Sequence, residues 1–378
     1  MKDALLTNGN AIAPIASKAG PTADLGVRFL DASDAGDRAE WLERWTAWPG
    51  REVSAHPAYG RLFARPGDRA MCASYRAAGA GILYPFVLRP LAAEPWADPG
   101  DRGCDLTNAY GYGGPYAWNA TESEARGFWS RFETWARGLG AVTSFARLSP
   151  FAEQLIPFPG DTRNSGLVVA RSLAPSPDEI WSDYDGKVRR NVQRARREGL
   201  EVAFDPRGER LDDFIAVYES TMDRRHALDQ FYFPRSFFES ILADLPGQYV
   251  FAHVLSKGRV VSSDLVLLSE ERAYYFLGGT LTEAFPMRPN DLLKHEIFLH
   301  CRGLGKKEIL LGGGYGPDDG LLRYKRSFAP SGERPFSVGL MTHDPDRSAR
   351  LVVRRRDWER GQGRDWSPVD GFFPAYRS

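Results

Sequence analysis

The sequence predicts an α/β (α+β) protein, in which mixed, mostly antiparallel sheets are flanked by helices and one unit occurs twice. Short apolar segments with strand character alternate with segments of helical periodicity along the chain. In the second half, three strand segments follow one another closely, which is typical of an antiparallel meander. Both halves also share one order of elements: strand, helix, hairpin or meander, helix, strand. This order indicates a duplicated unit whose copies have diverged.

Length and composition indicate a globular chain. Its 378 residues allow two or three domains of about 150 residues. Lys plus Arg equals Asp plus Glu, at 49 each, so any attraction to nucleic acid or membranes must be local. The cysteines Cys72, Cys104 and Cys301 lie far apart and match no metal-binding pattern. We therefore expect reduced, buried thiols in a cytoplasmic protein, and no metal site.

The composition also predicts how the chain is divided. Residues 1–24 are rich in Ala, Gly, Asn, Pro and Thr, which predicts a disordered leader. We expect neither a signal peptide nor a membrane span, since no long apolar run occurs. The two domains are expected at residues 25–171 and 172–343. Residues 344–378 are expected to form a C-terminal tail that packs back on the first domain.

The first half is expected to contain a hairpin and two helices. The predicted strands are 27–30, 70–75, 81–88 and 142–148, and the predicted helices are 37–48 and 122–138. The glycine-rich segment Asp105–Ala117, DLTNAYGYGGPYA, resists both helix and regular strand. Its Tyr110 and Tyr112 offer hydroxyl groups and flat faces to a ligand. The alternative is a rigid turn packed by aromatic rings.

The second half carries the longer helices and the meander. The predicted strands are 166–173, 201–204, 249–255, 260–268, 273–277, 308–314 and 335–341, and the predicted helices are 178–184, 187–199, 211–226, 233–245, 291–307 and 321–328. In the helix at 291–307, Leu293, Ile297, Cys301 and Leu304 form one apolar stripe.

The helix KVRRNVQRARREG, at residues 187–199, is the most charged stretch of the chain. A narrow apolar face leaves guanidinium groups around the rest of its circumference. The planar guanidinium group of arginine presents paired N–H donors that match the oxygens of a phosphate. We therefore predict that Arg189 and Arg190 form a clamp for a phosphate, which could belong to tRNA. The alternative is a solvated helix whose charge is balanced by acidic neighbours.

A glycine run directly follows the short strand EILL. Gly312, Gly313 and Gly314 allow a backbone to approach a ligand closely with its N–H groups free to point at it. A lysine, Lys325, follows in the next helical segment, so we expect a binding cleft at a sheet edge. The alternative is an ordinary connection between helix and strand. Asp264, which interrupts an apolar strand, either points at a substrate amine or lies on the outer face of the sheet.

Several motifs resemble the Fem-type and BioF2-like acyltransferases of the GNAT superfamily. They are KVRRNVQRARREGLEV, the strand end YYFLGGT, the loop DLTNAYGYGGPY, the closing FFPAYR, and LLKHEIFLHCRGLGKKEILLGGG followed by DGLLRYKRSF. The resemblance runs from about Val27 and is most specific in the second half. It implies two tandem GNAT-like domains. It also implies transfer of an aminoacyl group from aminoacyl-tRNA to an amine on a cell-wall precursor, whereas relatives use acyl-CoA.

The resemblance also implies site residues. Lys325, after Tyr324, falls where Fem-type enzymes carry a functional lysine beside an aromatic residue. An ammonium there stabilises the oxyanion that forms when an amine attacks an ester or thioester. The amine must also lose a proton, and Asp264 and Asp105 are candidate acceptors by residue type alone. Tyr275, in YYFLGGT, is a further candidate for substrate binding.

The donor is left open between two activated acyl carriers. GNAT enzymes that use CoA hold its pyrophosphate on a glycine-containing loop at a helix N-terminus, but the corresponding place here reads FPMRPNDLL. Fem-type enzymes also lack that loop, which favours aminoacyl-tRNA, with no bound cofactor. The balanced charge instead favours an acyl-CoA-dependent N-acetyltransferase of exopolysaccharide or amino-sugar metabolism. A third hypothesis is a scaffold that binds a partner and has no activity.

Overall fold

The computed structural model describes residues 26–314, 316 and 319–378, so the expected leader at 1–24 lies outside the described residues. In the first half, the predicted strands are confirmed. The strands of this half are β1 (Arg28–Asp31), β2 (Arg69–Ala77), β3 (Ala80–Pro90), β4 (Cys104–Thr107), β5 (Tyr116–Trp118), β6 (Ala141–Arg147) and β7 (Asp161–Ser172), and β7 is longer than expected. The helices are α1 (Ala35–Ala47), α2 (Pro57–Leu62) and α3 (Glu122–Leu139), with 3₁₀ turns η1 (Val53–Ala55), η2 (Leu91–Ala93) and η3 (Ala152–Gln154). The short strands β4 and β5 and the helix α2 were not predicted, and β4 and β5 lie at the two ends of the segment 105–117 that was expected to resist regular strand.

The second half contains the predicted meander, β9–β10–β11, whose strands pair antiparallel. Its strands are β8 (Glu201–Asp205), β9 (Tyr249–Ser256), β10 (Arg259–Leu268), β11 (Arg272–Thr280), β12 (Glu308–Gly313) and β13 (Glu333–Thr342). Its helices are α4 (Pro177–Asp183), α5 (Gly186–Arg197), α6 (Leu211–Arg225), α7 (Arg235–Asp244), α8 (Pro289–Gly303), α9 (Gly320–Arg326) and α10 (Pro345–Gly361), with 3₁₀ turns η4 (Asp229–Phe231), η5 (Thr282–Met287) and η6 (Ala375–Arg377).

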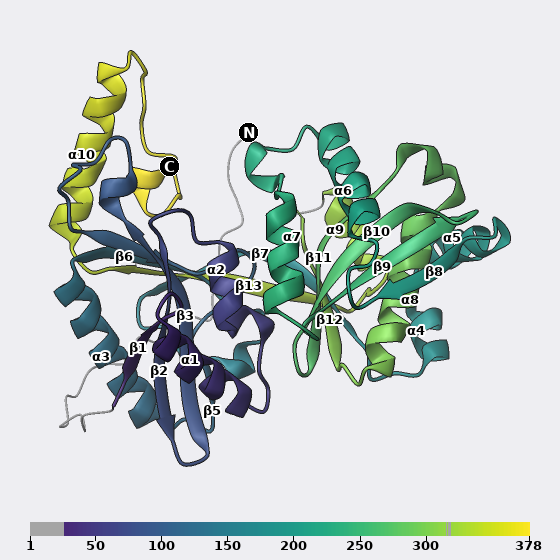
Figure 1. Cartoon of the computed structure of the whole chain (residues 1–378), viewed down its shortest axis with the longest axis horizontal. Helices are drawn as coiled ribbons and strands as arrows, with labels where there is room; N and C mark the ends of the chain where they lie inside the picture. The colour runs from purple at the N-terminus through teal and green to yellow at the C-terminus, as the bar shows by residue number, and fades with distance from the viewer. Residues whose placement is uncertain (1–25, 315, 317–318) are drawn as a thin grey trace, which may run out of the picture.

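The described residues form one 13-stranded sheet that runs through both halves (Figure 1). Its order is β1-β2-β3-β4-β6-β13-β7-β12-β11-β10-β9-β8, with β5 beside β3. Neighbours pair antiparallel except for β4 with β6 and β11 with β12, which are parallel. The expected mixed, mostly antiparallel sheet is thus confirmed.

The two halves exchange their last strands at the centre of the sheet. β7 closes the first half in sequence but pairs with β12 of the second half. β13 closes the second half but pairs with β6 of the first half. The two exchanged strands pair with each other from Glu333 to Leu340 of β13. The sheet is therefore continuous across the expected division at residue 171.

Each half has its own core on the face of the sheet. α3 begins with a capping box of Thr121 and Glu124 and ends at Gly140, whose φ is 79°. Its apolar side buries Phe128 and Phe132 against β2, β3 and β4. A helix with this pattern is held mainly by burial of that side.

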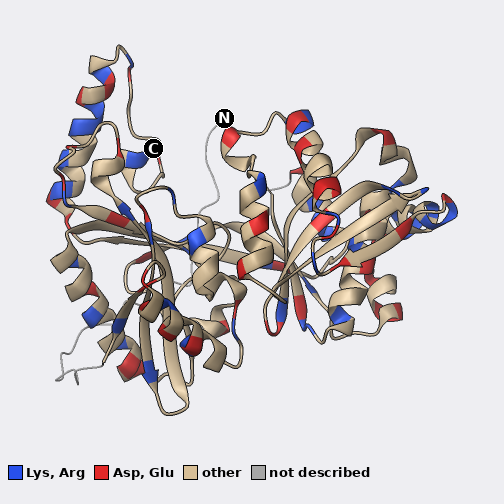
Figure 2. Cartoon of the chain, viewed as in Figure 1, with Lys and Arg blue, Asp and Glu red and all other residues tan. Residues whose placement is uncertain are grey.

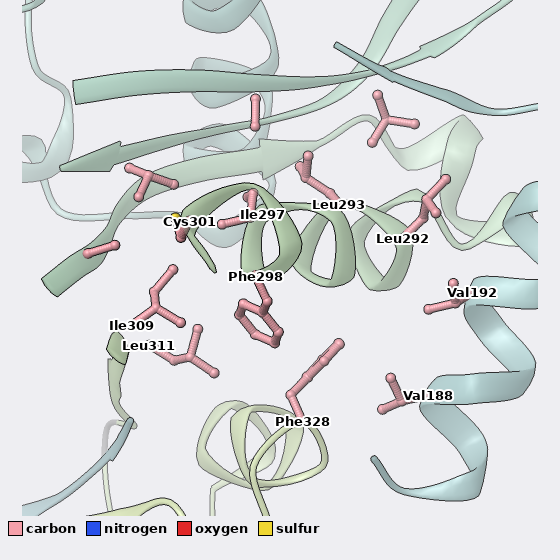
Figure 3. Packing of buried hydrophobic residues seen from close by; sticks show 14 of the residues in the cluster. Val188, Val192, Leu292, Leu293, Ile297, Phe298, Cys301, Ile309, Leu311 and Phe328 are labelled. Carbon is pink, nitrogen blue, oxygen red and sulfur yellow. The ribbon is translucent and has the colours of Figure 1, made fainter. Parts of the chain in front are cut away.

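In the second half, α8 lies against the sheet and carries the predicted stripe. Leu293, Ile297 and Cys301 are buried, while Leu304 lies beyond the helix end at Gly303 and is 48% exposed, so the stripe is one residue shorter than predicted. Figure 3 shows Phe298 pointing from α8 toward Phe328, and the rings lie 5.9 Å apart. The narrow apolar face of α5, Val188 and Val192, is buried in the same cluster.

The C-terminal tail contains a helix that the pattern did not predict, α10, and it contacts the first half. Arg354 Nε donates to the carbonyl oxygen of Trp96 over 3.0 Å, and the hydroxyls of Tyr376 and Thr143 are 2.8 Å apart. Figure 2 shows basic residues along α10. No helix of the described residues is long and apolar enough to cross a membrane. All three cysteines are free and buried.

A buried polar network joins the halves where the cavity described below opens. The carboxylate of Glu52, before η1, accepts a hydrogen bond from Tyr274 Oη over 2.7 Å and lies 3.4 Å from Arg272 Nη1. The backbone N–H of Val53 donates to Ser269 Oγ over 2.8 Å. These contacts fix η1 and α2 against β11.

Candidate active site

A cavity of about 730 Å³ lies where β11 and β12 separate. The two strands pair in parallel only from Arg272 to Tyr274 of β11. Beyond that point β11 continues beside β10, while Gly312 and Gly313 of β12 pair with β7. The strands diverge, and the space between them falls within the size range of small-molecule sites.

The equivalent gap in the first half is closed by the loop that follows β4. Asn108 Oδ1 accepts from the backbone N–H of Arg147 over 2.9 Å, and Gly113 N donates to the carbonyl oxygen of Arg147 over 2.8 Å. The loop therefore runs along β6 instead of leaving an open space. It also carries Tyr110 and Tyr112 to the wall of the second-half cavity.

The glycine run lines this cavity, as do the residues of the next helix. Gly312 has a φ of 78°, which disfavours any residue with a Cβ, and a Cβ there would lie 3.4 Å from Lys325 Nζ. A Cβ on Gly313 would lie 2.7 Å from the carbonyl oxygen of Leu167 on β7. Gly314 lies beyond the strand end and also lines the cavity. The backbone conformation at Gly312 thus favours glycine, and the absence of a side chain at Gly313 is what lets β7 approach the strand.

Lys325 is buried on α9 and reaches the cavity from that helix. Asp319 caps α9 by accepting from the backbone N–H of Leu322 over 2.6 Å, which orients the helix. Lys325 Nζ donates to the carbonyl oxygen of Gly313 over 2.6 Å. Burial, and next the charge of Lys294, lower the pKa of Lys325 to about 8, with Asp319 acting in the opposite direction.

Three predicted tyrosines also line the cavity: Tyr110, Tyr112 and Tyr275. Tyr59 Oη holds the Tyr110 loop by donating to its carbonyl oxygen over 2.8 Å. Burial raises the pKa of Tyr112, while Arg147 and a hydrogen bond from the Gly313 backbone oppose that rise. The face of Tyr275 receives Lys294 Nζ at 3.9 Å from the ring centre.

Other cavity residues were missed by the sequence reasoning. They are Arg147 at the end of β6, Leu167 on β7, and Tyr59, Tyr274 and Phe336. Arg147 lies between two aromatic rings, with its guanidinium carbon 5.3 Å from the ring centre of Tyr112 and 5.5 Å from that of Phe336. A charged residue at the end of an apolar strand was the available signal.

The structure does not bring two of the second-half candidates into the cavity. Asp264 lies neither in the cavity nor on the outer surface, because it is buried in an ion pair with Lys294 of α8. Burial raises the pKa of Asp264, and Lys294 opposes the rise. Tyr324 packs its ring 5.1 Å from that of Phe328, and its buried hydroxyl has no hydrogen-bond partner within the part of the chain that the structure describes. The predicted contact of Asp264 with a substrate amine is therefore contradicted by its position.

The position of Asp105 also does not suit the predicted role of proton acceptor. It is fully buried on β4, where Arg89 Nε donates to it over 2.7 Å and Arg377 of the tail forms a second ion pair. Its two carboxylate oxygens are thus occupied by guanidinium groups. Asp105 fastens the tail to the first half and does not line the cavity.

The predicted phosphate clamp does not reach the cavity either. Arg189 Nη1 donates to the carbonyl oxygens of Ser182 and Tyr184, which fixes the turn between α4 and α5. Arg190 is exposed on α5, which packs against α8. Arg189 thus makes local backbone contacts, and Arg190 is exposed and does not line the cavity. Among the described residues, no group of three or more His, Cys, Asp or Glu is placed to hold a metal ion.

Comparison with known proteins identifies the fold. A family model of an acetyltransferase (GNAT) domain matches residues 183–326, which include the glycine run and Lys325. The crystal structure of FemX is similar with a TM-score of 0.60 at 12% identity, covering 84% of this chain and 98% of FemX. No curated protein sequence matches the chain at a significant level.

Two further solved structures share this fold. One is the C-terminal domain of a putative lysylphosphatidylglycerol synthetase from Agrobacterium fabrum, with a TM-score of 0.54 at 17% identity, covering 84% of this chain and 96% of that domain. The other is L-PGS from Bacillus licheniformis, with a TM-score of 0.50 at 13% identity, covering 86% and 97%. Residues 183–326 thus match a GNAT acetyltransferase domain, which supports an acyltransferase, and the chain has the fold of FemX.

Proposed function

We propose that this acyltransferase moves an aminoacyl group from aminoacyl-tRNA to an amine on a cell-wall precursor, a sugar or a small metabolite. The observation that supports acyl transfer at this cavity is the position of Lys325. Its ammonium group donates a hydrogen bond to the carbonyl oxygen of Gly313 and lines the cavity between β11 and β12. A cation fixed at that place needs no rearrangement when negative charge develops beside it.

The proposed reaction is a direct transfer. The amine nitrogen attacks the ester carbonyl carbon, and the carbonyl oxygen becomes an oxyanion that Lys325 stabilises. The intermediate then collapses, the bond to the tRNA ribose oxygen breaks, and an amide remains. None of the described residues that line the cavity is a carboxylate. We therefore assign the proton that the amine loses to the leaving ribose oxygen.

The start of α8 supports a donor other than CoA. Asp291 lies in the first turn of that helix, is buried, and accepts a hydrogen bond from Asn191 of α5 over 3.1 Å. A carboxyl group thus occupies the place where a helix N-terminus would otherwise favour a pyrophosphate. The fold shared with FemX and the Fem-type motifs support an aminoacyl donor. The name of the lysylphosphatidylglycerol synthetase, a protein of this fold, likewise implies an aminoacyl product.

Acyl-CoA is the second candidate donor. It is favoured by the balanced charge of the chain, with 49 basic and 49 acidic residues, because domains that bind nucleic acid are usually basic overall. The GNAT match of the second half also favours it. In this alternative the acceptor amine attacks the thioester carbonyl carbon in the same way, an amide forms, and the thiolate of CoA is the leaving group.

A transfer assay tests the proposed donor. The protein is incubated with tRNA charged with radiolabelled amino acids and with three acceptors: a lysine-containing cell-wall peptide, an amino sugar and a small diamine. We expect labelled amide with at least one acceptor, and transfer by Lys325→Gln that is about a hundredfold to a thousandfold slower. Absence of transfer from every charged tRNA, together with transfer from acetyl-CoA, would establish the second candidate.

Thermal unfolding gives an independent test of the donor, since a ligand that binds the native state raises the melting temperature. We expect a non-hydrolysable aminoacyl-adenosine amide to raise it, and adenosine alone to raise it less. A rise with acetyl-CoA and none with the aminoacyl analogue would contradict the proposed donor.

A further inference from the structure

The charged residues that line the cavity are both basic. Of the described lining residues, only Arg147 from β6 and Lys325 from α9 carry a charge. One comes from each half of the chain, so the positive charge is made by the joining of the halves. A site with two cations and no acidic side chain on its described wall favours an anionic ligand.

Arg147 differs from the buried arginines elsewhere in the fold. Arg171, Arg272 and Arg377 each form an ion pair with a carboxylate. Among the described residues, no carboxylate forms an ion pair with Arg147, and its buried Nε has no hydrogen-bond partner. The side chain of Arg147 does hydrogen-bond to Tyr112, but that hydroxyl carries no charge. Buried or partly buried charges in proteins are usually paired with an opposite charge, so a guanidinium on a cavity wall without a carboxylate indicates an anion that arrives with a ligand.

The aromatic rings beside Arg147 determine which part of it a ligand can meet. Tyr112 and Phe336 pack against the guanidinium at 5.3 Å and 5.5 Å. Aromatic contacts of this kind stack on the faces of a guanidinium and leave its N–H edge for hydrogen bonds. That edge matches the two oxygens of a carboxylate or phosphate.

Tyr112 places this cation close to the proposed reaction centre. Its ring packs on Arg147, and it receives a hydrogen bond from the backbone of Gly313. The carbonyl of the same glycine accepts the hydrogen bond of Lys325. The two cations are therefore linked through Tyr112 and Gly313, and both line the same cavity.

We propose that Arg147 is a specificity-determining residue that binds an oxyanion, a carboxylate or a phosphate, of the substrate in this cavity. This inference rests on the proposed function, because it assigns the substrate that Lys325 acts on to an anionic class. The oxyanion has two sources: a carboxylate of the acceptor, which places its amine beside the glycine run, or a phosphate of the donor. Phe336 and Tyr112 hold the guanidinium still, so less conformational freedom is lost when the anion binds.

Calorimetric titration with small probes tests the inference without any turnover. The carboxylate arm compares 4-aminobutyrate with butylamine, and the phosphate arm uses inorganic pyrophosphate. We expect one of the two anions to bind, and butylamine to bind more weakly than 4-aminobutyrate if the acceptor supplies the oxyanion. Arg147→Gln should weaken binding of that anion by about tenfold to a hundredfold, since hydrogen bonds to charged groups are lost. The affinity of Arg147→Lys should lie between those of the natural chain and Arg147→Gln, because lysine keeps the positive charge but lacks the paired N–H donors of a guanidinium.

Arg163→Gln is the matched control, since Arg163 is an exposed arginine of β7 that does not line the cavity. It should bind the probe as the natural chain does. A second measurement needs no variant: the bound anion should protect Arg147, and not Arg163, from phenylglyoxal, read by mass spectrometry. If neither anion protects Arg147, or if folded Arg147→Gln binds as tightly as the natural chain, the inference is wrong. Anion binding with no acyl transfer from any donor would contradict the proposed function alone.

Discussion

Lys325 of α9 donates a hydrogen bond to the carbonyl oxygen of Gly313 on β12 over 2.6 Å, across the loop that separates the helix from the strand. The bond holds a nearly buried ammonium at the point where β11 and β12 separate. The neighbouring Gly312 lies directly beside this nitrogen and has a φ of 78°, a backbone conformation that favours glycine. The end of β12 and the helix α9 thus meet at the ammonium group of Lys325.

Replacing Lys325 should remove activity and leave the fold intact. We expect Lys325→Gln to lower kcat by about a hundredfold to a thousandfold, the usual loss when one oxyanion-stabilising group is removed. The control is Lys307→Gln, since Lys307 lies outside the cavity in an exposed ion pair with Glu271. Rates measured for both variants, with melting temperatures close to that of the natural chain, check this. Full activity of Lys325→Gln would remove Lys325 from the mechanism.

Activity should decline as the pH rises through about 8. Burial and the charge of Lys294 lower the pKa of Lys325 to about 8, so its ammonium form, which stabilises the oxyanion, is lost above that pH. The profile of kcat/KM should therefore show an alkaline limb near this value. Lys325→Arg should lack the limb, at a lower rate, because a guanidinium stays protonated in this range. A rate that climbs through pH 8 would instead make the neutral amine the active form.

Replacing Gly312 or Gly313 by alanine should lower the stability of the fold, for a different reason at each position. Gly312 has a φ of 78°, so Gly312→Ala should lose roughly 1–2 kcal/mol of unfolding free energy through backbone strain. Gly313→Ala puts a Cβ 2.7 Å from the carbonyl oxygen of Leu167, which should part β12 from β7. Gly303→Ala is the control, because nothing lies within 4 Å of that Cβ. Urea unfolding measures all three, and equal stabilities would contradict this reading of the glycine run.

The parts of the site that were predicted from sequence are close together in the chain. Gly312, Gly313 and Lys325 belong to one strand–loop–helix segment, so a local pattern was enough to bring them together. Most helices and strands followed from periodicity in the same way. The loop from Asp105 to Ala117 was harder, since its two ends form β4 and β5 while its middle closes a gap in the sheet.

The parts of the site that were not predicted depend on contacts between segments that are distant in the sequence. Arg147 reaches the cavity only because β7 and β13 exchange places between the halves, and strand order cannot be deduced from periodicity. Asp264 was considered as a base because of its residue type, but its partner Lys294 sits in the middle of a helix that otherwise buries an apolar stripe. An aspartate and a lysine on different elements give no common sequence signal.

The buried pair of Asp264 and Lys294 should be essential to stability as a pair. Asp264→Asn keeps the shape of the side chain but leaves the buried Lys294 ammonium without its carboxylate. We expect a loss of about 3–5 kcal/mol of unfolding free energy, as when one partner of a buried ion pair is removed. Asp161→Asn, at an exposed position of β7, should change it by less than about 0.5 kcal/mol. Urea unfolding of both variants checks this, and a fully stable Asp264→Asn would show that the pair carries no net charge interaction.

The double variant Asp264→Asn/Lys294→Met separates the structural role of this pair from its effect on the site. Removing both charges should recover much of the stability, because no charge is then left buried alone. It should also move the alkaline limb of kcat/KM above pH 8. The charge of Lys294 is one cause of the lowered pKa of Lys325, so its removal lets that pKa rise toward its ordinary value. An unmoved limb in a stable double variant would mean that burial alone lowers the pKa of Lys325.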